Sequence, residues 1–382
     1  GGVGLWSVVV ALPTVQAEFG VDRAGASLPY TLGMIGLVFG GVVMGKLSDR
    51  FGVMVPVVIG GVSLCIGYLL MAQAQTITSF AIIYAIFVGF LGSSSVLGTL
   101  IADVSHWFGR RRGIAVAIVS TGSYFAGAVW PPILQHAMAT WGWRATHVGI
   151  GLFCLATMLP LVLLMRRPGP VAHGRPSTAA GKPAPARPLG LKPSTLQNLI
   201  IIAGIACCVA MAMPQVHIVA YCTDLGYGPA RGAEMLALML ATGTISRLTF
   251  GVVMDRIGGI ATLVVASFLQ MVALSLFLPF DGLISLYVIS GLFGLFQGGL
   301  VPSYAMIARA LFPPEEAGTR VAIGLSATLA GMALGGWMSG AIFDLTGTYQ
   351  WAIVNGIGWN MLNLGIAAWL LLRARRMRVG KV

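Results

Sequence analysis

One charged side chain, that of Arg247, lies well inside a long apolar stretch of the chain, at residues 231–251. A planar guanidinium can hold a carboxylate through two parallel hydrogen bonds. A charge at this depth in a bilayer costs at least about 2.5 kcal/mol, and no Asp or Glu lies equally deep inside an apolar stretch to pair with it. Arg247 is therefore expected to face a central cavity and bind an anion, the alternative being solvation by backbone carbonyls and cavity water.

A second ionisable side chain, that of His217, is expected to face the same cavity from residues 195–221. An imidazole can gain or lose a proton near physiological pH. His217 is thus a candidate for substrate contact or proton coupling, and the alternative is a histidine bonded within a helix bundle. Weaker candidates for hydrogen bonding to a carboxylate or hydroxyl, each equally suited to packing, are Tyr124, Gln297, Tyr221 and Ser94.

The elements that position these residues must be membrane helices, because the chain is too apolar for a water-facing surface. Of its 382 residues, 57% are hydrophobic and 9% are charged, whereas soluble domains carry about 25% charged residues. Apolar runs long enough to cross a bilayer as helices recur along the whole chain. The expected fold is an all-α membrane protein with twelve transmembrane helices, at residues 1–17, 28–48, 54–74, 78–102, 112–136, 144–166, 195–221, 231–251, 259–279, 283–308, 318–342 and 350–373.

One stretch interrupts this succession of spans. Residues 167–193 are rich in Pro, Gly, Ala and basic residues without apolar periodicity, which is typical of a flexible linker. The prediction is a cytoplasmic linker between two pseudo-symmetric six-helix bundles, at residues 1–166 and 194–382. Residues 45–52 (GKLSDRFG) match residues 251–258 (GVVMDRIG), and Trp143 matches Trp351 at nearly the same separation along the chain.

Basic residues are distributed unevenly, and their distribution predicts the orientation. Most of the 23 Lys and Arg residues lie in alternate loops and near the C-terminal end, whereas the other loops hold only Arg23, Arg144 and Arg231. Because basic residues are enriched in cytoplasmic loops, both termini are expected in the cytoplasm, with a bacterial inner membrane as the expected location. This topology accounts for the net charge of +12, which does not indicate a nucleic-acid partner. Since the chain begins within an apolar run, further residues are expected before Gly1.

Neither a metal site nor a catalytic site is expected. All five cysteines lie in apolar runs and lack the spacing with histidines that a zinc site requires. A membrane enzyme would need paired carboxylates or a metal cluster at the membrane surface, and the sequence offers neither. The prediction is a protein that is not an enzyme and binds no cofactor.

The two matching loops resemble the signature of the major facilitator superfamily, which reads Gly, three residues, Asp, Arg, one residue, Gly. Residues 45–52 fit this pattern, and residues 251–258 are a weaker copy. The family usually continues with basic residues, whereas Val53 and Met54 follow here. The resemblance implies a loop that contacts the neighbouring bundle and stabilises the outward-facing state, although Arg50 could also be a simple topological charge. The expected latch residues are Gly45, Asp49, Arg50, Gly52, Asp255 and Arg256.

Within that superfamily, several stretches are similar to the monocarboxylate and oxalate–formate transporter branch. They are residues 106–113 (HWFGRRRG), the prolines at 131–132 followed by GWR at 142–144, and residues 214–219 (PQVHIV). Arg247 is the fourth feature, and in this branch the corresponding arginine binds the substrate carboxylate. The oxalate type has an additional lysine that residues 326–330 lack, and animal proton-coupled members have an aspartate where Gly243 stands. The resemblance therefore favours a substrate with one negative charge over a dicarboxylate.

The resemblance implies a secondary active transporter for a small organic anion, foremost a monocarboxylate. Its two halves would rock around a central site in alternating access. Proton symport and anion exchange both stay open, so the expected partners are a monoanionic substrate, a proton or counter-anion, and the lipid bilayer, with the protein a monomer. The alternatives are a drug–proton antiporter of the same superfamily, whose expected membrane acid is absent here, and a membrane receptor that does not transport.

Overall fold

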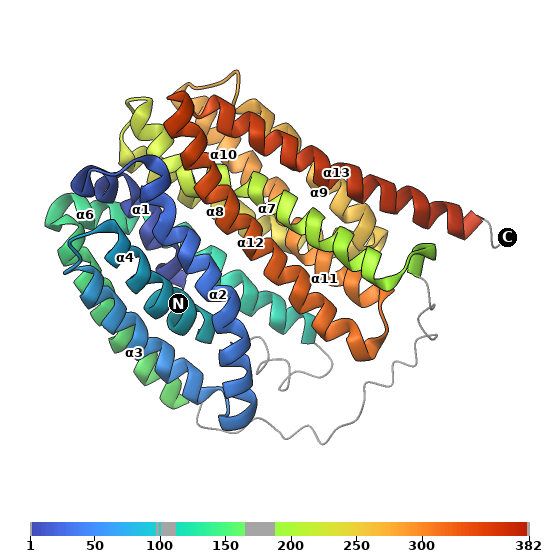
Figure 1. Ribbon diagram of the computed structural model, residues 1–382, viewed down its shortest axis with the longest axis horizontal. Helices are drawn as coiled ribbons and strands as arrows, with labels where there is room; N and C mark the ends of the chain where they lie inside the picture. The colour runs from blue at the N-terminus through green and yellow to red at the C-terminus, as the bar shows by residue number, and fades with distance from the viewer. Residues whose placement is uncertain (1, 97–98, 101–111, 165–187, 380–382) are drawn as a thin grey trace.

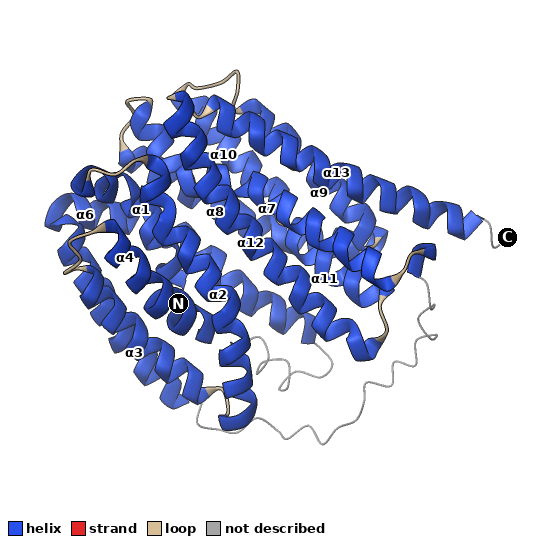
Figure 2. Cartoon of the chain, in the orientation of Figure 1, coloured by secondary structure: helices blue, strands red, loops and turns tan. Residues whose placement is uncertain are grey.

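The computed structural model describes residues 2–96, 99–100, 112–164 and 188–379 (Figure 1). Helices make up nearly all of this part of the chain, which contains no strand (Figure 2). The elements in chain order are α1 (Gly2–Phe19), α2 (Arg23–Phe51), α3 (Met54–Met71), α4 (Ile77–Ile83), the π-helix η1 (Tyr84–Ser93), α6 (Arg112–Leu164), the short 3-10 helix η2 (Pro188–Gly190), α7 (Pro193–Asp224), α8 (Pro229–Ile257), α9 (Gly259–Leu276), α10 (Leu283–Gln297), α11 (Leu300–Leu311), α12 (Pro314–Thr346) and α13 (Gln350–Val379).

The described helices account for the twelve predicted spans. Ten segments are long and apolar enough to cross a membrane. One of them, Thr121–Leu163, holds two predicted spans, because α6 bends at Gly142, whose φ of 79° is not helical. The helix α13 occupies the twelfth position and is not among the ten. The fourth span consists of α4 and η1, and the tenth consists of α10 and α11. The predicted all-helical membrane fold is confirmed.

The internal repeat is visible in the backbone where two equivalent helices end. α2 ends at Gly52 with φ 82° and ψ 165°, and α8 ends at Gly258 with φ 81° and ψ 163°. Each glycine donates its N–H to the carbonyl four residues earlier, at 2.8 and 2.9 Å. A positive φ favours glycine because it has no Cβ, so the two matching sequence motifs produce the same helix ending. The tryptophan pair differs, since Trp143 is buried and Trp351 is 59% exposed.

The helices form two bundles that lie side by side (Figure 1). The first runs from α1 to α6 and the second from α7 to α13. Between them, α2 packs along α12 and α6 packs along α8. The predicted linker lies outside the described residues up to residue 187, as do residues 101–111 of the loop before α6, so the exact limits of the two domains stay a prediction.

Buried amides join α13 to the second bundle. Asn363 accepts a hydrogen bond from the Tyr304 hydroxyl and donates one to Ser267 Oγ, both at 2.8 Å. Asn360 donates to the Ser267 carbonyl at 2.9 Å. Hydrogen bonds of this kind between membrane helices contribute about 0.6–2 kcal/mol each. They fix α13 against α9 and α11, away from the boundary between the bundles.

Candidate functional site

Arg247 lies on α8, the helix of the second bundle that packs against α6 of the first. Its guanidinium carbon is 3.9 Å from the centre of the Tyr124 ring on α6. None of the four ion pairs among the described residues includes Arg247, and its buried Nε has no hydrogen-bond partner in the same part of the chain. A cation over an aromatic face gains roughly 0.5–2 kcal/mol. This gain is smaller than the cost of placing the charge in a membrane, so the contact with Tyr124 alone does not offset that cost.

Gly243 allows Tyr124 to reach Arg247. It lies one helical turn before the arginine, and a Cβ at this position would be 3.0 Å from Cδ1 and Cε1 of the Tyr124 ring. Such a contact is tighter than ordinary packing permits, so a larger side chain here would displace the ring. The contact between Arg247 and Tyr124 therefore depends on the glycine at position 243. An aspartate there would pair with Arg247 and would also displace the Tyr124 ring from it.

Two buried glutamines meet beside this pair. Nε2 of Gln215 on α7 donates to Oε1 of Gln297 at the end of α10, at 2.6 Å. The bond fixes the amide of Gln297, whose Nε2 has no partner among the described residues and lies 3.5 Å from the place of a Cβ on Gly243. A buried donor without a partner costs about 1–3 kcal/mol. An acceptor on a bound ligand would remove this cost, which supports the prediction for Gln297.

His217 uses both ring nitrogens within the second bundle. Nδ1 lies 3.0 Å from the Tyr349 hydroxyl, and Nε2 lies 2.7 Å from the carbonyl oxygen of Gly336 on α12. Tyr221 packs edge-on against the Tyr349 ring, with centroids 5.6 Å apart. Burial raises the pKa of the Tyr349 phenol, so its hydroxyl keeps a proton and can either donate to or accept from the imidazole. His217 and Tyr221 thus belong to a cluster around Tyr349, while Tyr124 and Gln297 belong to the cluster around Arg247.

An ion pair that the sequence did not reveal joins the two bundles. Arg23, the first residue of α2, places one guanidinium nitrogen 2.8 and 2.9 Å from the carboxylate oxygens of Asp224, the last residue of α7. Its guanidinium carbon also lies 4.7 Å from the Phe343 ring centre and 5.8 Å from that of Tyr349. Arg23 was expected to be a loop charge, yet it is only 6% exposed. The pair therefore lies next to the cluster that holds His217.

A carboxylate of the second bundle also caps a helix of the first. The oxygens of Asp344 on α12 accept hydrogen bonds from the backbone N–H groups of Arg23 and Ala24, at 2.8 and 2.7 Å. The first N–H groups of a helix have no partner within it, and a carboxylate is a favourable acceptor for them. Together with the Arg23–Asp224 pair, this cap ties the start of α2 to the ends of α7 and α12. Residues so distant along the chain give no sequence signal of their contact.

The expected latch residues lie at the other ends of α2 and α8. Asp49 and Arg50 are exposed at the end of α2, and Asp255 and Arg256 are exposed at the end of α8. None of them enters an ion pair within the described ranges, and the Arg50 guanidinium lies 5.2 Å from the ring centre of its neighbour Phe51. Gly45 faces open space, and Gly52 ends α2. Among the described residues, an ion pair thus joins the two bundles at the Arg23 end of α2 and none joins them at the Arg50 end.

Ser94 lies on the first bundle, where its hydroxyl bonds to the Phe90 carbonyl one turn earlier. Its neighbour Ser93 lines a cavity of about 210 Å³, together with Leu5, Leu37 and Ser123. Tyr124 follows Ser123 in the chain, but neither Tyr124 nor Arg247 lines this cavity. Ser94 itself is buried and does not line the cavity.

No group of three or more His, Cys, Asp or Glu residues that could hold a metal ion occurs in the described part of the chain. All five cysteines are buried and unpaired by disulfides.

Comparison with known proteins identifies the family of the chain. The model of the Major Facilitator Superfamily matches residues 1–293 and 235–381. The chain belongs to this superfamily. Monocarboxylate transporter 13 of Rattus norvegicus is 26% identical over 88% of this chain and 78% of its own length. The uncharacterized MFS-type transporter YcxA of Bacillus subtilis is 25% identical over 88% of this chain and 83% of its own length.

A solved structure shares the fold of this superfamily member. The crystal structure of the nucleoside transporter NupG aligns with a TM-score of 0.71 and 14% identity, covering 97% of this chain and 96% of that one. The predicted resemblance to the superfamily is thus confirmed, and relatives named as monocarboxylate transporters are among those found. The chain is a multi-pass membrane protein with a transporter fold.

Proposed function

We propose that this protein is a secondary active transporter for a small monocarboxylate, with Arg247 as the residue that holds the carboxylate. The observation that carries the proposal is the guanidinium of Arg247, which has no ion-pair partner among the described residues and lies on the ring of Tyr124 from the opposite bundle. A carboxylate would supply the missing charge and accept two parallel hydrogen bonds. The donor left free on Gln297 lies beside the same site, and relatives named as monocarboxylate transporters favour this substrate class.

The site suits alternating access because both bundles contribute to it. Arg247 and Gln297 belong to the second bundle and Tyr124 to the first. An anion bound between these residues would contact both bundles, so its affinity would differ between the two relative positions of the bundles. Such a difference in affinity couples a ligand to a conformational equilibrium. Transport then follows if the site opens to one side of the membrane at a time.

We assign the structure to an inward-facing state. The bundles are tied by Arg23, Asp224 and Asp344 at one end, while the latch residues at the other end are exposed. The exposed end carries Arg50 and Arg256, and the positive-inside rule favours the cytoplasm for such an end, in keeping with the predicted cytoplasmic side of both termini. A bacterial inner membrane remains the expected location.

His217 offers a route for proton coupling. Its imidazole and the Arg23 guanidinium both lie against Tyr349. In the imidazolium form His217 can still donate to Gly336 and Tyr349, since both partners have oxygen acceptors. A second positive charge so near Arg23 would repel it and favour separation of the bundles at this end. Proton uptake from outside would thus open the outer side, whereas anion exchange would need no such step.

The test is uptake by the purified protein in liposomes. A panel of labelled monocarboxylates, with a dicarboxylate and a nucleoside for comparison, is measured with an inward proton gradient and separately with unlabelled substrate inside. We expect a monocarboxylate to accumulate and Arg247→Gln to abolish its uptake, because the amide cannot neutralise the carboxylate. Arg231→Gln is the matched control, since Arg231 pairs with Glu234 on the exposed side of the same helix.

Three outcomes would contradict the proposal. Normal uptake by Arg247→Gln would remove the arginine from the site. Uptake of the nucleoside or of a cationic drug, with no carboxylate transported, would assign another substrate class. Binding of a monocarboxylate without any flux would make the protein a receptor.

A further inference from the structure

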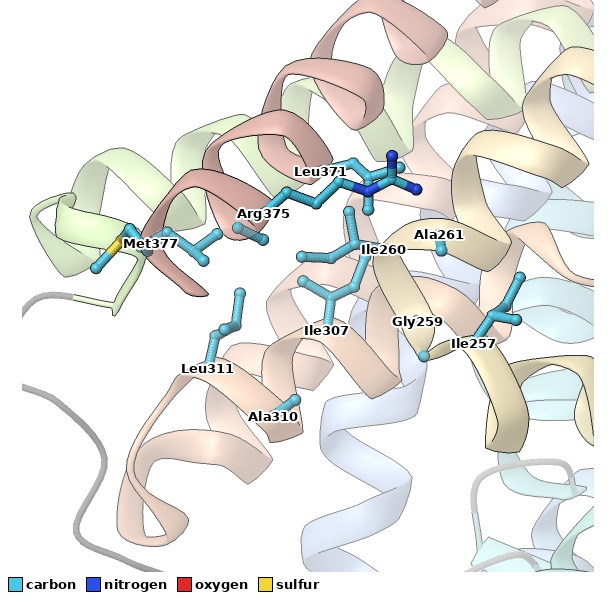
Figure 3. A pocket seen from close by; sticks show the side chains of 13 residues that line it. Ile257, Gly259, Ile260, Ala261, Ile307, Ala310, Leu311, Leu371, Arg375 and Met377 are labelled. Carbon is cyan, nitrogen blue, oxygen red and sulfur yellow. The ribbon is translucent and has the colours of Figure 1, made fainter. Parts of the chain in front are cut away.

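A cavity of about 600 Å³ lies within the second bundle, separate from the residues around Arg247 (Figure 3). Its walls are the end of α8, the start of α9, the last part of α11 and the final turns of α13, together with Leu189 of η2. The lining is mainly apolar, with Ile260 and Ile307 among its larger side chains. Its volume is in the range of ligand-binding pockets, about 300–1,000 Å³. None of the residues proposed for the anion site, the outer ion pair or the latch lines it.

The cavity lies at the level where membrane helices end. α8 ends at Ile257 and α11 ends at Leu311, and both residues line the cavity. Ile257 and Met377 at its rim are 48% and 40% exposed. Apolar side chains exposed at helix ends meet lipid rather than water in a bilayer. The cavity is therefore accessible from the boundary between the acyl chains and the headgroups.

Among the described residues that line the cavity, one has a charged side chain, Arg375. It extends from α13 toward Ile260 and Ala261 of α9 (Figure 3). It belongs to none of the four ion pairs among the described residues. Its neighbour Arg373 is already engaged, because its Nε donates to the Leu189 carbonyl at 2.6 Å. An apolar cavity thus lies under an unpaired guanidinium.

Further positive charge surrounds this rim. Arg256 immediately precedes the lining residue Ile257, and Arg309 immediately precedes the lining residue Ala310. Both arginines are exposed, and neither forms an ion pair with another described residue. An apolar cavity with arginines at its rim suits a ligand that has a long apolar part and an anionic head.

We infer that this cavity binds one anionic phospholipid of the cytoplasmic leaflet, with an acyl chain in the apolar part and the phosphate on Arg375. Basic pockets between helices on the cytoplasmic side of a membrane are suited to such headgroups. A zwitterionic lipid brings its own ammonium close to Arg375 and binds less well. Because the walls come from four helices, the bound lipid stabilises the packing of α13 against α9 and α11.

The inference is tested with the purified full-length chain after removal of lipid in an uncharged detergent. Phosphatidylglycerol, or phosphatidylcholine with the same acyl chains, is added back, and native mass spectrometry and thermal unfolding are recorded. One tightly bound phosphatidylglycerol and a raised unfolding temperature are expected. Arg375→Gln is expected to weaken this binding about fivefold, the effect of one basic side chain near an anionic lipid. Ala374→Trp should abolish it by filling the cavity, which Ala374 lines.

Arg376→Gln is the matched control, because Arg376 lies on the same helix but not in the lining. It should retain the lipid. Should Ala374→Trp fail to fold, Ala310→Leu at the rim provides the second test of occupancy. Equal binding of the two lipids, an equal loss in Arg376→Gln, or stabilisation by inorganic phosphate alone would overturn the inference.

Discussion

The guanidinium of Arg247 differs from an ammonium group in being planar and in offering parallel donors to a carboxylate. Arg247→Lys keeps the positive charge and loses both this fork and part of the contact with Tyr124. We predict a rise in KM for the transported monocarboxylate of about tenfold or more, since replacing a bidentate contact by a single one removes about 1.5 kcal/mol or more. The measurement is concentration-dependent uptake in liposomes. An unchanged KM would show that the carboxylate binds elsewhere.

The Gln215–Gln297 hydrogen bond gives a second prediction at the scale of single residues. Gln215→Met leaves the buried Oε1 of Gln297 without its donor. We expect this variant to lose about 1–3 kcal/mol of stability, the cost of an unsatisfied buried group. The double variant Gln215→Met with Gln297→Met removes both polar groups and should regain part of that loss.

Thermal unfolding of the two single variants and the double variant measures this coupling. The double variant should also bind its substrate more weakly, because the donor of Gln297 is gone. Strictly additive losses of stability would mean that the two amides do not interact.

The sequence could predict the anion site only in part. Arg247 is recognisable because a charge in an apolar stretch requires an explanation, whatever surrounds it. Gln215 is not recognisable, because an amide beside Pro214 gives no indication of the direction in which it points. His217 was expected to share the cavity with Arg247, and only the three-dimensional arrangement shows its two partners, Tyr349 and Gly336.

At the scale of elements, the start of α2 depends on a carboxylate of α12. Asp344→Asn removes the negative charge from the cap on Arg23 and Ala24. We predict that the bundles separate more often at this end, which is the outer end in the proposed orientation, by about fivefold if the loss is near 1 kcal/mol. Thr31→Cys reports this opening, because the Thr31 hydroxyl donates to the Ala333 carbonyl across the same boundary, at 3.1 Å.

Opening is measured as the rate at which a membrane-impermeant maleimide labels Thr31→Cys from outside. The five native cysteines are buried and give little background. Glu234→Gln is the matched control, because its partner Arg231 lies on the same helix. Equal labelling rates with and without Asp344→Asn would show that the cap does not hold the bundles together.

The limits of the helices were harder to predict than their existence. Span 28–48 was predicted from the apolar residues, yet α2 begins at Arg23, because Asp22 accepts a hydrogen bond from the Gly25 N–H at 2.7 Å. Likewise α12 begins at Pro314 and ends at Thr346, beyond the predicted limits of 318 and 342. Hydropathy marks the part of a helix in the lipid core, while capping groups outside it decide where the helix ends.

At the scale of the whole molecule, the twelve-helix architecture could be predicted because lipid allows few alternatives. A backbone in hydrocarbon must satisfy its own hydrogen bonds, so each apolar run of sufficient length becomes a helix. The repeat of Gly52 and Gly258 then indicates two bundles. The relative position of the bundles follows from contacts such as Arg23 with Asp224, which hydropathy does not register.

The two clusters predict how proton coupling and transport separate. His217 contacts Tyr349 and, through it, the outer ion pair, whereas Arg247 contacts Tyr124 and the anion site. If the proton binds at His217, His217→Gln should lose accumulation driven by a proton gradient and keep exchange of labelled for unlabelled substrate, because exchange moves no net proton. Gradient-driven accumulation and exchange are both measured as uptake into liposomes. Tyr349→Phe, which keeps the ring and removes the hydroxyl, is measured in the same way. Gradient-driven accumulation that survives in His217→Gln would mean that the proton travels on the substrate, and the histidine would then serve only to hold α7 against α12.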